Sequence, residues 1–173
     1  MKKIILLLLI VSTYANAQKL AEDKTDEFTK VKVKRTVWYP FTKKNGTYRP
    51  TRSSYRISKL DTITLLDLEM MINNEVYSIN EGDAIMFLMQ DGSLVSIKSI
   101  KYTITSTGDG THKYGGSANL GTTSTYLVTE DDIKKLTAGT IMKTRIYTSK
   151  GYEEYEVSES LDRGIKNCLK IVQ

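Results

Sequence analysis

The sequence predicts an α+β domain: a mostly antiparallel, meandering sheet of about eight strands with two helices packed on it. Several segments alternate apolar and polar residues with the period of two that is expected of strands. Two pairs of such segments are joined by hairpin turns, at Asp91-Gly92 and at residues 149–151. Two further segments begin with a residue that caps helices, Thr129 and Ser158. We find no internal repeat or linker after residue 30, so we expect residues 29–173 to form a single domain.

Residues 1–17 have the pattern of a cleavable signal peptide. Two lysines precede an apolar run over residues 4–11, and Ala15-Asn16-Ala17 supplies the small residues before a cleavage site. The run is too short to span a bilayer, and no cysteine stands at the cleavage site to accept a lipid. We therefore predict a periplasmic or secreted protein, without membrane insertion, whose mature chain begins at Gln18. The other interpretation of this segment is a buried N-terminal helix.

The composition predicts a core that is stabilised by packing alone. Removing 17 residues from 173 leaves a mature chain of 156, which is enough for one hydrophobic core. Cys168 is the only cysteine, so no intramolecular disulfide can form. Its spacing places it on the apolar side of the last helix, where we expect an inert core thiol.

Charge is distributed unevenly along the chain. Residues 18–60 carry twelve Lys and Arg against four Asp and Glu, a net charge of +8, whereas residues 61–173 carry eleven against sixteen, a net charge of −5. Two interpretations follow: the basic front packs on the acidic remainder, or it binds an anionic partner.

The first strands follow a polar leader. Residues 18–28 have little to bury, and we expect a flexible leader there. Residues 31–39 alternate valine with polar residues, which predicts a strand that Pro40 ends. Residues 41–60 are rich in turn-forming residues, and only residues 54–58 among them are predicted to form a strand.

A long strand and a short one come next. Over residues 63–72 the apolar Leu66, Leu68 and Met70 share one phase, and Asp67 and Glu69 belong to the other, which we expect to face water. Asn73-Asn74 predicts a turn into a short strand over residues 75–79.

The Asp91-Gly92 hairpin is expected to be central in the sheet. A two-residue turn would place Leu88 opposite Val95 and Met86 opposite Ile97. Both faces would then be apolar, which is typical of strands covered on both sides. After Ile97 the apolar phase slips by one residue, so we expect a bulge or a sharp bend at Lys98-Ser99.

The last third predicts an insert, a strand, a hairpin and two helices. Residues 106–123 contain five glycines and are expected to be structureless. A strand over residues 125–128 precedes a short helix that Thr129 caps and that ends at Leu136. After a hairpin of residues 141–148 and 152–157, Ser158 caps the final helix. Its apolar residues form one stripe: Leu161, Ile165, Cys168, Leu169 and Val172.

No pattern in the chain indicates catalysis, a metal or a cofactor. His112 is the only histidine, so neither a zinc site of several His and Cys ligands nor a convincing Ser-His-Asp triad can be assembled. The glycines near His112 match neither a P-loop nor a dinucleotide fingerprint. Paired acids such as Glu81 and Asp83, or Asp131 and Asp132, are better explained by turns and helix termini. We therefore expect a protein that is not an enzyme.

Aromatic and cationic residues in the basic front predict a binding surface. Such side chains can stack on sugar rings and hold anionic groups. The expected partner is an unknown protein or an anionic glycan or other envelope polymer, and not a nucleic acid. The competing interpretation is that the aromatic rings pack on the sheet while the cations reach water. The expected binding residues are Trp38, Tyr39, Tyr48, Arg49, Arg52, Tyr55 and Arg56.

Two segments carry a resemblance to a known group of proteins. They are GDAIMFLMQDGSLVSI, and YLVTEDDIKKL followed by IMKTRIYTSKGYEEYEV. In strand and helix pattern, residues 67–172 resemble small exported proteins of unknown function from Gram-negative gut-type bacteria. The resemblance implies no activity and no site residues.

Two functions are therefore expected from the sequence. The first is an exported non-catalytic protein that binds a protein or an anionic or glycan component of the envelope. The second is an envelope enzyme that acts on glycan or peptidoglycan. A deep pocket in which acids converge would favour the enzyme.

Overall fold

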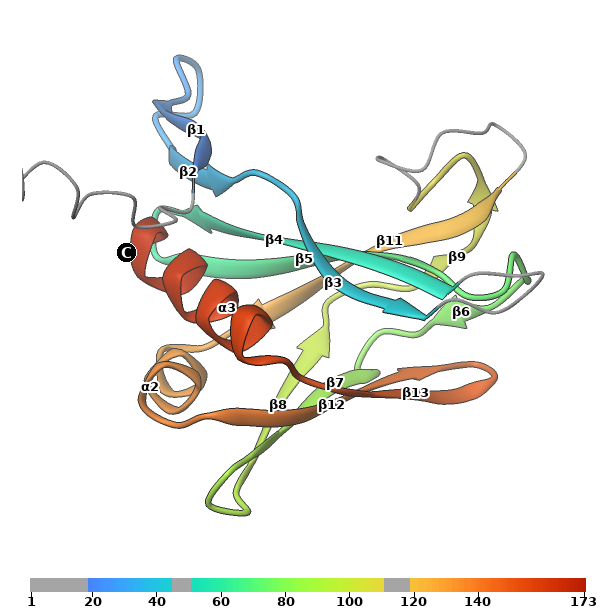
Figure 1. The fold of residues 1–173 in the computed structure, drawn as a ribbon. Coiled ribbons are helices and arrows are strands. Elements are labelled where there is room, and N and C mark those ends of the chain that lie inside the picture. Colours follow the sequence, from blue (N-terminus) through green and yellow to red (C-terminus); the bar gives the residue numbers. More distant parts are fainter. Residues whose placement is uncertain (1–18, 45–50, 111–118) are drawn as a thin grey trace, which may run out of the picture.

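The computed structural model, which describes residues 19–44, 51–110 and 119–173, confirms a mostly antiparallel α+β fold (Figure 1). Within these residues the main sheet has eleven strands rather than about eight, and a second sheet has two. The strands are β1 (Leu20–Thr25), β2 (Lys32–Thr36), β3 (Tyr39–Lys44), β4 (Thr51–Leu60), β5 (Ile63–Met71), β6 (Ser78–Ile79), β7 (Ala84–Met89), β8 (Leu94–Ser99), β9 (Thr103–Ile104), β10 (Ser106–Thr107), β11 (Leu120–Val128), β12 (Ile141–Thr148) and β13 (Gly151–Glu156). The helices are α2 (Glu130–Ala138) and α3 (Glu159–Val172).

The strand order departs from a simple meander. It runs β1-β2-β4-β5-β11-β8-β7-β12-β13, with β3 paired to β4, β10 paired to β11, and β6 and β9 forming the small sheet. The neighbours β5–β11, β11–β8 and β7–β12 are distant in sequence. Turn signals in the sequence predict pairing only between strands that follow each other, so they could not predict these three pairings.

The main sheet has two halves that meet at a narrow junction. β8 and β11 share two residue pairs, Ser99 with Tyr126 and Lys98 with Leu127, whereas β4 and β5 share nine. Figure 1 shows β4, β5 and β11 on one side and β7, β8, β12 and β13 on the other, with α3 crossing between them. The helix therefore packs inside the bend of the sheet.

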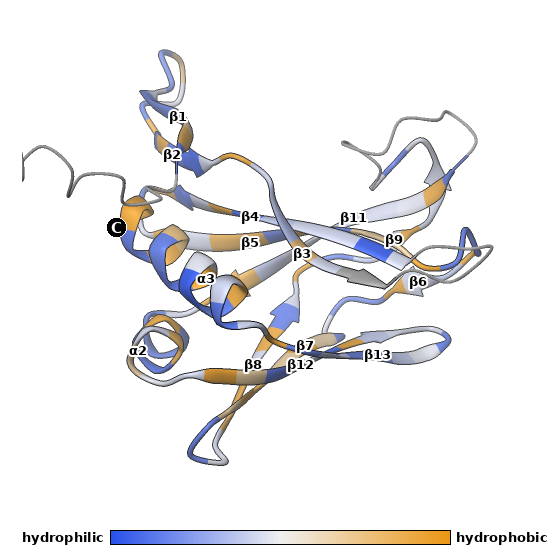
Figure 2. Ribbon diagram, in the orientation of Figure 1, coloured by the Kyte–Doolittle hydropathy of each residue, from blue (hydrophilic) through white to orange (hydrophobic). Residues whose placement is uncertain are grey.

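The core lies between the two halves and α3. Hydrophobic and hydrophilic residues interchange along many of the strands and along α3 (Figure 2), and the buried hydrophobic residues of these elements form the core. The predicted stripe of α3 is confirmed, with Ile165, Cys168, Leu169 and Val172 buried. The strands contribute Tyr55, Ile57, Leu66, Leu68, Phe87, Ile97, Tyr126 and Ile146 among others.

Both helices begin at the predicted capping residues. The Thr129 hydroxyl accepts from the backbone of Asp132, whose carboxylate accepts from the backbone of Thr129, which makes a complete capping box. The Ser158 hydroxyl accepts from the backbone N–H of Leu161 at 3.3 Å. These contacts satisfy backbone donors at the helix starts.

The Asp91-Gly92 turn is present, but its predicted register is wrong by one residue. The backbone N–H of Met89 donates to the carbonyl of Ser93, which encloses a three-residue loop with Gly92 at a φ of +84°. Phe87 therefore lies opposite Val95, and Ile85 opposite Ile97.

The hairpin is consequently covered on one face only. Ile85, Phe87 and Ile97 are buried in the core. The other face carries Met86 and Leu88, which are half-buried, and Leu94, which is 55% exposed. The hairpin was expected to be covered on both faces, and this expectation is wrong. In the observed register the buried residues of β7 lie opposite the buried residues of β8, so they all belong to one face.

The bulge or sharp bend predicted at Lys98-Ser99 is wrong. The ladder with β7 is regular through Lys98 and continues at Ser99, whose backbone N–H donates to the carbonyl of Asp83. The chain bends only at residues 100–101, where the Ser99 hydroxyl donates to the carbonyl of Lys101. The later apolar residues Tyr102 and Ile104 are exposed. The phase slip thus marks a change of sheet rather than a bulge.

The N-terminal part contains more strand than expected. The predicted leader includes β1, which pairs with β2 although most of its side chains are exposed. Pro40 does not end a strand: it lies within β3, an edge strand paired only to β4 among the described residues, where a missing N–H is tolerated. β4 is ten residues long rather than five.

Two other expectations also change. Asp67 and Glu69 do not face water but are buried, at 8% and 7% exposure. The insert predicted over residues 106–123 contains β10 and the first residues of β11, which pair with each other. Residues 111–118, with His112, lie outside the described residues.

Candidate binding cleft

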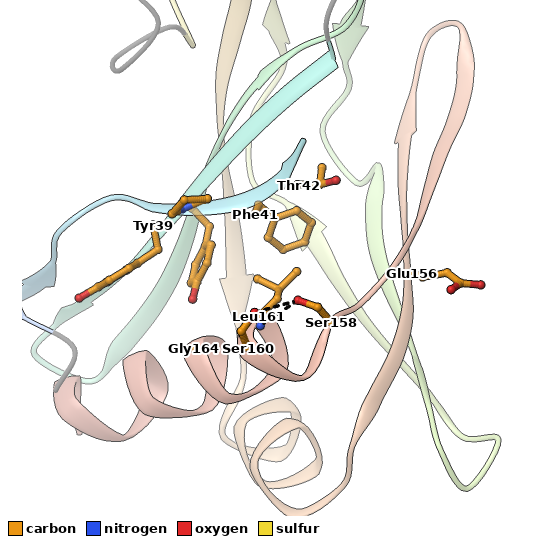
Figure 3. Close-up of a pocket in the computed structure, with 10 residues that line it drawn as sticks. Tyr39, Phe41, Thr42, Glu156, Ser158, Ser160, Leu161 and Gly164 are labelled. Atoms are coloured by element: carbon orange, nitrogen blue, oxygen red, sulfur yellow. Dashed lines mark hydrogen bonds between the residues drawn. The ribbon is translucent and has the colours of Figure 1, made fainter. Parts of the chain in front are cut away.

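A cleft of about 400 Å³ opens between β3 and the first turns of α3 (Figure 3). One wall is the strand from Tyr39 to Thr42, and the other is α3 with the end of β13. Its volume is in the range of small-molecule sites. The residues that line it are Tyr39, Pro40, Phe41, Thr42, Tyr55, Glu156, Ser158, Ser160, Leu161 and Gly164.

Aromatic packing fixes the β3 wall. The ring of Tyr55 lies 6.0 Å from that of Tyr39 and 5.8 Å, edge to face, from that of Phe41. The Tyr39 hydroxyl accepts from the backbone N–H of Lys19 at 2.7 Å. Since Tyr55 is itself buried in the core, these contacts hold β3 against the core beside α3.

The lining combines an apolar floor with hydroxyl groups. Figure 3 shows Phe41 and Leu161 close together, with Thr42 beyond Phe41 along β3 and Ser158 beside Leu161, whereas the Glu156 side chain is directed away from them. Among the described residues that line the cleft, Glu156 is the only charged one. The cleft therefore offers apolar contact together with neutral donors and acceptors.

Tyr55 remains a neutral phenol. Burial, followed by the neighbouring Cys168, raises the pKa of Tyr55 well above its usual value. Burial also raises the pKa of Cys168 to about 11. The Cys168 thiol lies 3.9 Å from the Tyr55 hydroxyl and is buried, as predicted for an inert core residue.

The structure divides the predicted binding residues between the two faces of the sheet. Tyr39 and Tyr55 line the cleft. Trp38 and Arg56 lie together elsewhere: the Arg56 guanidinium stacks 4.5 Å from the Trp38 ring centroid and bonds Asp67 at 2.8 Å. Arg52 alternates with Tyr55 along β4 and so faces the same side as Arg56.

The remaining predicted binding residues, Tyr48 and Arg49, lie outside the described residues. The described members thus do not form one aromatic and cationic surface. Several cations have internal partners instead. Arg35 pairs with Glu22 at 2.9 Å, and Lys59 donates to the side chain of Gln173.

Sequence reasoning missed the α3 side of the cleft. Ser158 carried only a helix-cap signal, and Glu156 only that of an exposed strand. Because Thr42 and Glu156 are 114 positions apart in the sequence, no local pattern joins them. The neighbouring Tyr39 and Tyr55 were found because an aromatic cluster is visible in the sequence.

A second hollow, of about 240 Å³, lies on the exposed face of the hairpin. Its apolar part is Met86, Leu88 and Leu94, and its charged part includes Arg145 and Glu154. These two charged side chains bond each other at 2.7 Å, and Arg145 also stacks on Tyr152 at 4.2 Å. Its charges are therefore already paired within the chain.

Comparison of the chain with protein-family models, with curated proteins and with solved structures found no match. Within the described residues, three or more His, Cys, Asp or Glu side chains nowhere gather closely enough to hold a metal ion. Over the same part of the chain, no helix has the length and apolarity needed to cross a membrane.

Proposed function

We propose that this protein is an exported, non-catalytic binding protein whose ligand is a glycan of the cell envelope, held in the cleft between β3 and α3. The observation that carries the proposal is the lining: an apolar floor of Phe41 and Leu161 beside the hydroxyl groups of Thr42, Ser158 and Ser160. Sugar rings present C–H faces and hydroxyl groups together, so such a lining complements them.

The charge of the lining favours a glycan that is not strongly anionic. The described lining holds no cation that would attract an anion, and the side chain of its one charged residue, Glu156, points away from the other lining residues (Figure 3). The basic front does not compensate within the described cleft, because Arg56 is engaged with Asp67 and Trp38 on the other face. The anionic polymer expected from charge alone is therefore less well supported than a neutral one.

A binding role is better supported than glycoside hydrolysis. Hydrolysis of glycosides requires two carboxyl groups that face each other across the scissile bond. The described lining contains one, Glu156. The export in this proposal rests on the predicted signal peptide, residues 1–17, which lie outside the described residues.

The test is to fill the cleft from its rim. Ser160 is exposed on the first turn of α3, so Ser160→Trp introduces an indole without altering the core. We expect wild-type mature protein to bind at least one member of a panel of immobilised neutral envelope oligosaccharides, and S160W to lose that binding. Thermal unfolding should remain unchanged.

The matched control is Arg163→Trp, on the same helix at an exposed position that does not line the cleft. This variant should bind like the wild type. Failure of the wild type to bind any neutral oligosaccharide, or equal binding by S160W, contradicts the proposed function.

A further inference from the structure

A glycine lies in the interior of α3, on the side of the helix that borders the cleft. Gly164 is buried, and it lines the cleft together with Ser160 and Leu161, which precede it by four and three positions. Residues with this spacing lie on one side of a helix, and Figure 3 shows Gly164 beside Ser160 on α3. The wall that α3 gives to the cleft therefore has no side chain at this point.

Neither a helix end nor a turn accounts for this glycine. α3 continues for eight residues beyond Gly164, to Val172, so the glycine does not end the helix. Its φ is not among the positive values found at other glycines of the described chain, and residues with a side chain can therefore adopt its conformation. Glycine is nevertheless one of the poorest helix formers, because it loses the most backbone freedom on folding. Gly164 thus weakens α3, and its surroundings must explain it.

A side chain at position 164 would occupy part of the cleft. The Cα–Cβ bonds of a helix are tilted towards its N-terminus, so a side chain covers the turn that precedes it. For position 164 this is the turn that holds Ser160 and Leu161, which both line the cleft. Close approach of a ligand to the backbone is one of the uses of a glycine. The absent side chain leaves this turn of α3 uncovered on the side of the cleft.

We propose that Gly164 is a specificity-determining residue, which allows one sugar ring of the glycan to lie flat against α3. This inference rests on the proposed function and deepens it. The C–H face of the ring lies over Gly164 and against Leu161, and the hydroxyl groups at the edge of the ring bond Ser158 and Ser160. A methyl group at position 164 would lift the ring from the helix and separate its hydroxyl groups from both serines.

The first test adds this methyl group with Gly164→Ala. We expect the Kd of G164A for the neutral oligosaccharide that the wild type binds to rise at least tenfold. The thermal unfolding midpoint should rise by about 2 to 4 °C, because alanine is the better helix former. A residue needed for internal packing would give the opposite change in unfolding temperature.

The matched control is Asn167→Ala. Asn167 lies three positions further along α3, is half-buried and does not line the cleft. Alanine is a better helix former than asparagine as well, so the unfolding midpoint of N167A should also rise. Its Kd should equal that of the wild type, because the cleft is unchanged.

The second test detects the contact without altering the protein. Titration of the isotopically labelled wild type with the same oligosaccharide should shift the backbone amide resonance of Gly164. The amide resonance of Lys170, which is exposed near the end of the same helix, should not move. A Gly164 resonance that stays in place while the oligosaccharide binds would contradict the inference.

The outcomes separate the inference from the proposed function. If G164A binds like the wild type while S160W does not bind, Gly164 has no role in specificity and the cleft remains the binding site. If G164A unfolds at a lower temperature than the wild type, the glycine serves internal packing and the inference is overturned. If S160W binds normally, or the wild type binds no neutral oligosaccharide, both the inference and the proposed function fail.

Discussion

Arg56 shows how the predicted cationic front is built into the fold. Its guanidinium bonds Asp67 at 2.8 Å and stacks on Trp38, and the second oxygen of Asp67 accepts from the Thr125 hydroxyl. Three strands and the segment before β3 are joined by these contacts. This arrangement is what burying an acidic residue requires, because a buried carboxylate without partners is costly.

Replacing Asp67 with Asn should therefore destabilise the protein. We expect Asp67→Asn to lower the free energy of unfolding by about 2 kcal/mol, less than for a fully buried pair because water still reaches Arg56. Urea denaturation gives this value. The control is Glu154→Gln in the exposed pair with Arg145, for which we expect no measurable change. Equal effects at the two sites would contradict this account of Asp67.

Among the elements, the hairpin of β7 and β8 depends on one backbone conformation. Gly92 has a φ of +84°, which residues with a side chain rarely adopt. No atom lies within 4 Å of the position that a Cβ would take. Any cost of a substitution there is therefore conformational and not steric.

Gly92→Ala should lower the free energy of unfolding by about 1 kcal/mol. Ser96→Ala, at an exposed position of β8, is the matched control and should be close to neutral. Chemical denaturation of both variants measures the difference. A neutral Gly92→Ala would mean that the loop adopts another turn in solution.

Elements with local signals were the ones that sequence could predict. The caps Thr129 and Ser158 and the stripe of α3 depend on residues within one or two helical turns of each other, so they are visible in a short window. Hairpin register is less visible, because a loop of three residues instead of two moves Phe87 opposite Val95.

Pairings between distant segments were not visible at all. β1 has few apolar side chains to bury and becomes a strand only because β2 accepts its backbone hydrogen bonds. The cleft likewise depends on contacts between distant segments. Its two walls lie side by side because β3 pairs with β4 and α3 packs on the core. Tyr39 and Tyr55 could be nominated from composition, but Ser158, Ser160 and Glu156 could not.

At the scale of the whole molecule, buried phenols and the thiol predict alkaline sensitivity. Burial raises the pKa of Tyr55, Tyr77, Tyr126 and Cys168 above the usual values. A group whose pKa is higher in the folded state favours folding while it is protonated, and this contribution is lost as the pH rises above its unfolded value.

Below pH 9 these groups should therefore change the free energy of unfolding little. Above about pH 9 to 10 the free energy of unfolding should fall progressively, because the groups ionise in the unfolded chain before they ionise in the folded protein. Urea denaturation at a series of pH values tests this. Unchanged stability at pH 11 would show that the phenols are accessible to water in the folded protein.

The narrow junction between β8 and β11 has a mechanical consequence. Two residue pairs resist bending far less than the nine that join β4 and β5. The angle between the halves of the sheet therefore also depends on the two helices, since α2 packs on β8, α3 packs on β4, and the helices pack on each other. A force that opened this angle would separate the halves at the seam, while each half kept its internal ladders.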